Sequence, residues 1–187
     1  RDLVRSRGLG DVYKRQPILY GGQQVYSSLP DDDRSYNSYA MAYQFDAYGK
    51  SYPAGFPGTM LQINSGDTLK LNLVNDLAVG HDDPSDPVFV TNFHYHGSHT
   101  PDLSQADNVY VHIEPGQTVP IQIPISTYEN SVGANWYHPH VHEQTKPQVE
   151  GGLAGMIMVG DPLEPWPQYK DELTQVNMVL SEVNISA

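Results

Sequence analysis

Four of the eight histidines fall in two pairs of the form His-x-His, His94 with His96 and His138 with His140. In a β-strand the side chains at positions i and i+2 point to the same face, about 6–7 Å apart along the chain. Each pair therefore presents two imidazoles to one side of a sheet. Imidazole nitrogens suit copper, zinc, nickel or iron, and the chain has no cysteine to add a thiolate. Two such strands brought together would offer a metal ion four nitrogen ligands.

Both pairs lie in longer motifs that resemble a known family. The strings are Asn92-Phe-His-Tyr-His-Gly97 and Trp136-Tyr-His-Pro-His-Val-His142, with Gly152-Leu-Ala-Gly155 and an apolar segment following. Gly66-Asp67-Thr-Leu and Ile113-Glu-Pro-Gly116 fit the same pattern. Over about residues 40–160 the chain resembles the first cupredoxin domain of the multicopper oxidases. The resemblance implies an all-β fold, a cupredoxin-like Greek-key β-sandwich.

The resemblance also implies a role for each paired histidine in a trinuclear copper cluster between the first and last domains. His94 would ligate the type 2 copper, His96 and His138 would share one type 3 copper, and His140 would ligate the other. In the family this cluster reduces dioxygen to water, while a type 1 copper oxidises a small reducing substrate such as a phenol or cuprous ion. The type 1 site and the remaining ligands would belong to C-terminal cupredoxin domains of the same protein. We therefore expect a truncated fragment of a periplasmic or secreted oxidase, inactive by itself.

The loop after the first pair contains two acidic residues that could serve such a cluster. The family places a proton-relaying acid there, and Asp107 is our candidate catalytic residue, with Asp102 as a near competitor. A carboxylate suits the task because the reduction of dioxygen to water consumes protons. A turn-forming role for Asp107 before Asn108 is the equally weighted alternative.

The other conspicuous residues near the pairs have simpler interpretations. His142 has the strand parity of the ligands, but we interpret it as a neighbour of the site or a non-ligand. We interpret Trp136 and Tyr137 as core packing beside the site. The three remaining histidines, taken as ordinary polar residues, are His81, His99 and His112.

Two alternative functions belong to other classes. A zinc-dependent hydrolase could use His94, His96 and His99, although Ser98 stands where the metallo-β-lactamase pattern needs an aspartate. A non-catalytic, cupredoxin-like structural protein is the second alternative, and such a protein is expected to lose the metal ligands that are present here. An electron-transfer cupredoxin is excluded, because a blue-copper site requires a cysteine and the chain has none.

Alternating apolar residues predict the strands that carry these motifs. Residues 60–63 and 69–74 flank Ser65-Gly66-Asp67 and predict a hairpin. Residues 119–125 alternate as well, and Pro120 and Pro124 indicate an edge strand. Further strands are expected at residues 88–95, 134–138 and 153–159. With no amphipathic helix apparent, the pattern predicts an antiparallel β-sandwich.

Composition limits the partners and suggests the domain boundaries. The chain of 187 residues has 22 acidic and 10 basic residues, a net charge of −12, which argues against nucleic acid or an anionic membrane as partner. Residues 1–16 contain SRGLGDVYKRQ, the translation of a common sequencing adapter, and we interpret them as non-native. We expect the first cupredoxin domain at 17–165 and the start of a second at 166–187, whose opening strand would be 175–183.

Overall fold

The fold is given by a computed structural model of the chain. It describes residues 3–13, 19–20, 23–24, 36–55, 57–78, 83–97, 99–100, 106–128 and 132–181. Side chains are described from residue 41 onward within these ranges.

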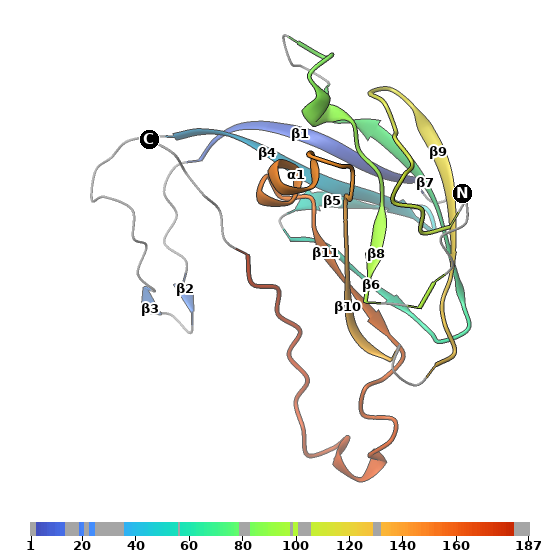
Figure 1. The fold of residues 1–187 in the computed structure, drawn as a ribbon. Coiled ribbons are helices and arrows are strands. Elements are labelled where there is room, and N and C mark those ends of the chain that lie inside the picture. Colours follow the sequence, from blue (N-terminus) through green and yellow to red (C-terminus); the bar gives the residue numbers. More distant parts are fainter. Residues whose placement is uncertain are drawn as a thin grey trace.

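Two β-sheets form the body of the protein (Figure 1). The first has the strand order β5-β4-β1-β7-β9 and the second the order β6-β11-β10-β8. The strands of the first sheet are β1 (Leu3–Tyr13), β4 (Tyr36–Ala47), β5 (Lys50–Gly55), β7 (Thr68–Asp76) and β9 (Thr118–Pro124). Those of the second are β6 (Gly58–Ile63), β8 (His94–His96), β10 (Gly133–His138) and β11 (Gly155–Val159). A separate pair is formed by β2 (Leu19–Tyr20) and β3 (Gln23–Gln24).

A single apolar core joins the two sheets. In β7 and β9 alternate residues are buried, so that each strand turns one face to the core. Leu73 from the first sheet and Ile157 from the second are both fully buried in the same cluster. Aromatic rings fill its centre, where Tyr43 and Phe93 pack against Tyr137 at ring-centroid distances of 5.2 and 5.3 Å. The predicted all-β sandwich is confirmed.

The predicted edge strand is confirmed and the predicted hairpin is wrong. β9 ends the first sheet, with Pro120 opposite Asn72 and Pro124 opposite Thr68 of β7. β6 and β7 follow one another along the chain, but they lie in different sheets, and β6 pairs with β11 instead. The turn at Gly66 (φ +82°) therefore passes the chain from one sheet to the other. Both strands still bury apolar side chains, because their apolar faces meet across the core.

Three further details depart from the sequence-based predictions. The pairs β1–β7 and β6–β11 are parallel, so the sandwich is mixed and not purely antiparallel. Residues 88–95 form no continuous strand, because Asp86 caps a short 3₁₀ helix, η1 (Pro87–Phe89), ahead of β8. A short helix that was not predicted, α1 (Thr145–Glu150), follows β10. Its buried Gln148 donates to the carbonyls of Val88 and Val90 at 2.7 Å each. This contact fixes the segment that leads into β8.

The chain ends differ from one another in structure. β1 falls inside the segment interpreted as adapter-derived, and its backbone pairs with both β4 and β7. After β11 the chain runs outside the two sheets (Figure 1) and contains the 3₁₀ helix η3 (Pro167–Tyr169). Residues 173–181 form no strand, so the expected opening strand is not found over 175–181, and residues 182–183 lie outside the described ranges.

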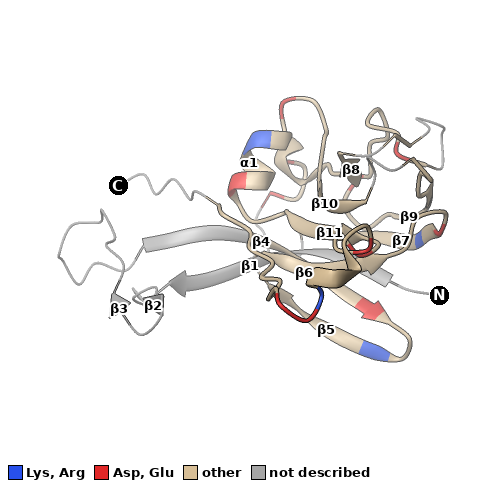
Figure 2. Cartoon of the chain, turned by 90° about the horizontal axis from the view of Figure 1, so that it is seen from below, with Lys and Arg blue, Asp and Glu red and all other residues tan. Residues whose placement is uncertain are grey.

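Charged residues are dispersed over the described surface (Figure 2). The lysines from residue 41 onward sit on separate elements, namely Lys50 on β5, Lys70 on β7, Lys146 on α1 and Lys170 at the end of η3. The described side chains therefore form no clustered basic surface. No helix within the described ranges is long and apolar enough to cross a membrane.

Candidate metal centre

The two His-x-His pairs lie on neighbouring antiparallel strands. β8 pairs with β10 so that His94 is opposite His138, Tyr95 is opposite Tyr137 and His96 is opposite Trp136. Tyr95 and Tyr137 point into the core and are 1% and 0% exposed. Because side chains alternate along a strand, their burial turns the histidines to the other face. The burial of two tyrosines thus aims the imidazoles at a common point.

Two glycines allow the strands to take this arrangement. Gly155 on β11 lies against the ring of Tyr137, where a side chain at residue 155 would overlap the ring atoms. Gly97 ends β8 with φ +100°, and a Cβ there would lie 2.6 Å from Oδ1 of Asn135. Larger residues at either position would displace the strand that carries the histidines.

The four paired histidines lie together at the end of these strands. His94 is central, with ring-centroid distances of 5.4 Å to His96, 5.1 Å to His138 and 5.0 Å to His140. One ring nitrogen from each of His94, His96 and His138 lies within 4.8 Å of the others, an arrangement that could hold a metal ion. His140 is 5.9 Å from His138, ring to ring, and stands beside this group of three.

Hydrogen bonds at Nδ1 set the tautomer of two of the histidines. Nδ1 of His138 is 2.8 Å from the Pro139 carbonyl, and Nδ1 of His94 is 2.9 Å from Oδ1 of Asp107. A carbonyl or carboxylate oxygen only accepts, so both Nδ1 atoms donate a proton and Nε2 keeps its lone pair. Burial lowers the pKa of His138 to about 4, against the opposing effect of the Pro139 carbonyl. A neutral imidazole is the form that ligates metals.

The spacing of His96 and His138 fits a shared ion. Nδ1 of His96 is 3.2 Å from Nε2 of His138. Two nitrogens bound at about 2 Å to one ion with tetrahedral angles lie about 3.3 Å apart. Imidazole is a good ligand for copper. The donor set and its spacing therefore fit copper without a rearrangement of the strands.

Asp107 is the acid that contacts the histidine group. Its Oδ1 accepts from Nδ1 of His94 at 2.9 Å and from the backbone N–H of Tyr95 at 2.8 Å, and its Oδ2 accepts from Oγ1 of Thr100 at 3.3 Å. The carboxylate side chain is only 9% exposed. Its competitor Asp102 lies outside the described residues.

The position of Trp136 differs from the core packing that we inferred for it from the sequence. Tyr137 packs in the core as expected, but Trp136 is 38% exposed. Its ring stacks on His138 with a centroid distance of 3.9 Å and an interplanar angle of 24°, and lies 5.1 Å from His96. Position i−2 from His138 on the same strand is the sequence signal that places it on the histidine face.

Neither His99 nor His142 belongs to this group. The His99 ring lies beside Tyr128, with a centroid distance of 5.8 Å, and the His142 side chain is 90% exposed. The zinc-hydrolase interpretation required His99 to join His94 and His96, whereas the structure brings His138 to them. That alternative is not favoured, and neither is a structural protein without metal ligands.

A comparison with protein families identifies the chain. A model of the multicopper oxidase family matches residues 41–164. The chain belongs to the multicopper oxidases. The match includes both His-x-His pairs, Asp107 and the strands from β5 to β11.

Curated multicopper oxidases are similar over the same region. Laccase-4 of Thanatephorus cucumeris is 35% identical over 118 residues, which is 58% of this chain and 19% of that protein. The multicopper oxidase mco of Staphylococcus aureus is 28% identical over 139 residues, 70% of this chain and 28% of that protein. This multicopper oxidase chain thus spans less than three tenths of the length of either relative.

Solved structures confirm the fold. A multicopper oxidase from Pediococcus acidilactici has a TM-score of 0.53 at 18% identity, covering 87% of this chain and 26% of that one. McoA from Aquifex aeolicus has a TM-score of 0.51 at 21% identity, covering 87% and 27%. The predicted cupredoxin-like Greek-key β-sandwich of this multicopper oxidase is confirmed.

Proposed function

We propose that this chain supplies half of the histidine ligands of a trinuclear copper cluster in a larger oxidase. The observation that carries the proposal is the meeting of His94, His96 and His138, with ligand atoms within 4.8 Å of one another. When bound, copper at this centre would carry the four-electron reduction of dioxygen to water. The electrons would come from a small reducing substrate, such as a phenol or cuprous ion, oxidised at a type 1 site elsewhere in the same protein.

Each histidine has a distinct place in this proposal. His96 and His138 would share one type 3 copper, and their facing nitrogens, 3.2 Å apart, support this assignment. His94 would ligate the type 2 copper through Nε2, since its Nδ1 is bonded to Asp107. His140 would ligate the second type 3 copper, and its position beside His94 and His138 is compatible with that role.

Asp107 would hold His94 and pass protons. A carboxylate bonded to the second nitrogen of a metal-ligating imidazole fixes its tautomer and raises its basicity. The same carboxylate lies beside His94 and is 9% exposed, so it would pass protons between the surface and the copper site. These two tasks together account for an acid placed at the edge of the histidine group.

The organisation of the whole protein is part of the proposal. Residues 17–165 would form the first cupredoxin domain, residues 166–187 would begin the second, and residues 1–16 would be adapter-derived. Further cupredoxin domains of the same protein would bring the remaining ligands to the exposed side of the histidine group. The protein would act in the periplasm or outside the cell. Sequencing the gene across both ends of this chain tests the domain division.

The ligand assignment is tested by titrating the chain with Cu(II). We expect the affinity for Cu(II) to fall at least tenfold in His138→Ala and in His96→Ala. His142→Ala is the matched control, because this histidine belongs to the same His-Pro-His-Val-His run and its side chain is exposed. Calorimetry gives the affinity, and electron paramagnetic resonance counts the nitrogen ligands. Equal affinities in His138→Ala, His142→Ala and the unchanged chain would refute the proposal.

A further inference from the structure

Asn92 is a buried residue whose amide hydrogen-bonds to two other segments of the chain, so that with its own segment it connects three. The residue is 1% exposed. Nδ2 donates to the carbonyls of Val109 at 3.0 Å and Val111 at 3.1 Å, and Oδ1 accepts from the backbone N–H of His140 at 2.6 Å. Both amide hydrogens and one oxygen lone pair are therefore engaged.

The three segments are those that carry the groups of the copper site. Asn92 itself lies two residues before His94, on the approach to β8. Val109 and Val111 follow Asp107 in the loop that bears the carboxylate. His140 is the outermost member of the second pair. One side chain thus connects the first pair, the second pair and the acid.

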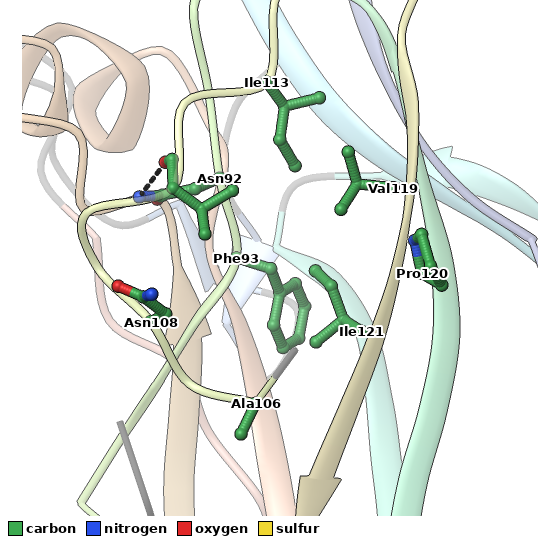
Figure 3. Close-up of a pocket in the computed structure, with 9 residues that line it drawn as sticks. Asn92, Phe93, Ala106, Asn108, Ile113, Val119, Pro120 and Ile121 are labelled. Carbon is green, nitrogen blue, oxygen red and sulfur yellow. Dashed lines mark hydrogen bonds between the residues drawn. The ribbon is translucent and has the colours of Figure 1, made fainter. Parts of the chain in front are cut away.

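The space beneath this loop is lined mostly by apolar groups, which could not take over the hydrogen bonds of Asn92. A cavity of about 10 Å³, roughly the room for one water, lies between Asn92, the loop and β9 (Figure 3). On the core side it is lined by apolar groups that include Phe93, Ile113 and Ile121. Apolar packing is not directional, so it does not fix the loop's distance from the His140 backbone. The hydrogen bonds of Asn92 are directional, and they fix the distance between the loop and the His140 backbone.

We propose that Asn92 is a positioning residue of the copper centre, which sets His140 and the Asp107 loop relative to His94. The inference rests on the proposed function, since it concerns the ligands of that site. Without the amide, the His140 N–H and two loop carbonyls would lose their partners, and His140 and Asp107 could shift independently. A metal shared among ligands on different segments loses affinity when their spacing is no longer fixed.

Asn75 provides an unusually close control for this role. It is fully buried, its Nδ2 donates to the carbonyls of Phe89 at 2.6 Å and Ile113 at 2.7 Å, and its Oδ1 accepts from the Leu77 N–H at 3.1 Å. The two asparagines therefore have the same number and kind of backbone bonds. Asn75 also bonds to the segment after Asp107, at Ile113, but none of its partners is a histidine of the site. The comparison therefore isolates the bond between Asn92 and His140.

The experiment compares Asn92→Ala with Asn75→Ala in the 187-residue chain. We expect both variants to lower the melting temperature, and only Asn92→Ala to lower the Cu(II) affinity, by at least tenfold. Amide hydrogen exchange supplies a second readout, because the His140 N–H should lose protection in Asn92→Ala alone. Equal Cu(II) affinities in the two variants, measured where both are folded, would overturn the inference.

Asn92→Asp keeps the inference testable if Asn92→Ala does not fold. The carboxylate has the shape of the amide and can still accept from His140, but it places an oxygen against the carbonyls of Val109 and Val111. We expect the His140 amide to remain protected and the Tyr95 amide, which is bonded to Asp107, to exchange faster, with weaker copper binding. Unchanged Tyr95 exchange and copper binding would overturn the inference.

Failure of the inference can be separated from failure of the proposed function. If His138→Ala leaves Cu(II) binding unchanged, the copper site itself is wrong and the inference falls with it. If His138→Ala abolishes binding while Asn92→Ala and Asn75→Ala bind copper equally, the site stands and only the role of Asn92 is refuted.

Discussion

The rings of Tyr43 and Tyr137 are in contact and both hydroxyls are buried, but only the Tyr137 hydroxyl has a hydrogen-bond partner among the described residues. The Tyr137 hydroxyl donates to the Thr59 carbonyl at 2.8 Å, whereas the Tyr43 hydroxyl has no partner among the described residues. Burial raises the pKa of both side chains, so both hydroxyls remain protonated. The pair lets one measure what a hydrogen bond contributes at nearly the same place in the core.

We expect Tyr137→Phe to lower the free energy of unfolding by about 1 kcal/mol, because it removes a bond and leaves a carbonyl without its donor. Tyr43→Phe should leave stability unchanged or raise it, because it removes a buried hydroxyl that gains no bond on folding. Urea denaturation of both variants measures the difference. A larger loss in Tyr43→Phe than in Tyr137→Phe would contradict the bonding described.

Asp107 gives a prediction specific to the site. Asp107→Ala removes the acceptor for Nδ1 of His94, so the His94 ring can rotate and change tautomer. We expect the Cu(II) affinity of the chain to fall by about 10- to 100-fold, with Asp102→Ala as the comparison. If Asp102→Ala has the larger effect, the acid of the site has been assigned to the wrong residue.

At the level of residues, spacing predicted which histidines lie together but not the contacts that hold them in place. The two His-x-His pairs are recognisable in the sequence because side chains on one face of a strand recur at every second residue. Asn92 was visible in its motif, yet nothing in the sequence shows that its amide bonds to His140, 48 residues away. Trp136 was misjudged because an aromatic residue is as suited to a core as to stacking on an imidazole. Local sequence patterns do not show contacts between segments that lie far apart along the chain.

Among the elements, the β4–β5 hairpin contains a residue unsuited to its turn. Tyr48 and Gly49 both have positive φ, +52° and +74°. Two such residues match a type I′ turn, for which Asn-Gly is a preferred sequence. We expect Tyr48→Asn to raise the free energy of unfolding by roughly 0.5 to 1 kcal/mol, with no change in Cu(II) affinity. Thermal and urea unfolding measure it, and a less stable variant would show that the Tyr48 side chain contributes more than its backbone costs.

Strand positions could be predicted better than strand partners. Alternation located β6, β7 and β9, and the prolines of β9 correctly indicated an edge. The short turn after β6 suggested a hairpin, but a turn of that length can equally well connect two sheets. The choice depends on β11, whose residues 155–159 lie far along the chain. Nor does the sequence around Gln148 predict α1, because this helix is held by contacts to residues 88 and 90.

For the molecule as a whole, we expect the isolated chain to bind Cu(II) weakly and to show no oxidase activity. In the proposed function it offers four histidines to a cluster that other domains complete, and it contains no cysteine for a type 1 copper. Electrons from a donor therefore have no route to the site. Oxygen uptake with a phenolic donor measures the activity of the copper-loaded chain.

A zinc-loaded sample supplies the opposite test. A hydrolase with three histidines and a bound water would be complete without a second domain. Hydrolysis of an activated ester or lactam that depends on zinc and is lost in His94→Ala would favour that class and remove the oxidase interpretation. We expect neither hydrolysis nor oxygen uptake from this chain.

The separation of β6 from its partner has a consequence for synthesis on the ribosome. The sheet that carries the histidines cannot close until β11 has emerged, because β6, which ends at Ile63, pairs there only with residues 155–159. At about 5–20 residues per second, translation leaves β6 without its partner for about 5 to 20 s. During that interval its backbone can pair with other nascent chains. Slower elongation should therefore lower the soluble yield of this chain, and the paired histidines can meet only after β10, which ends at His138, has emerged.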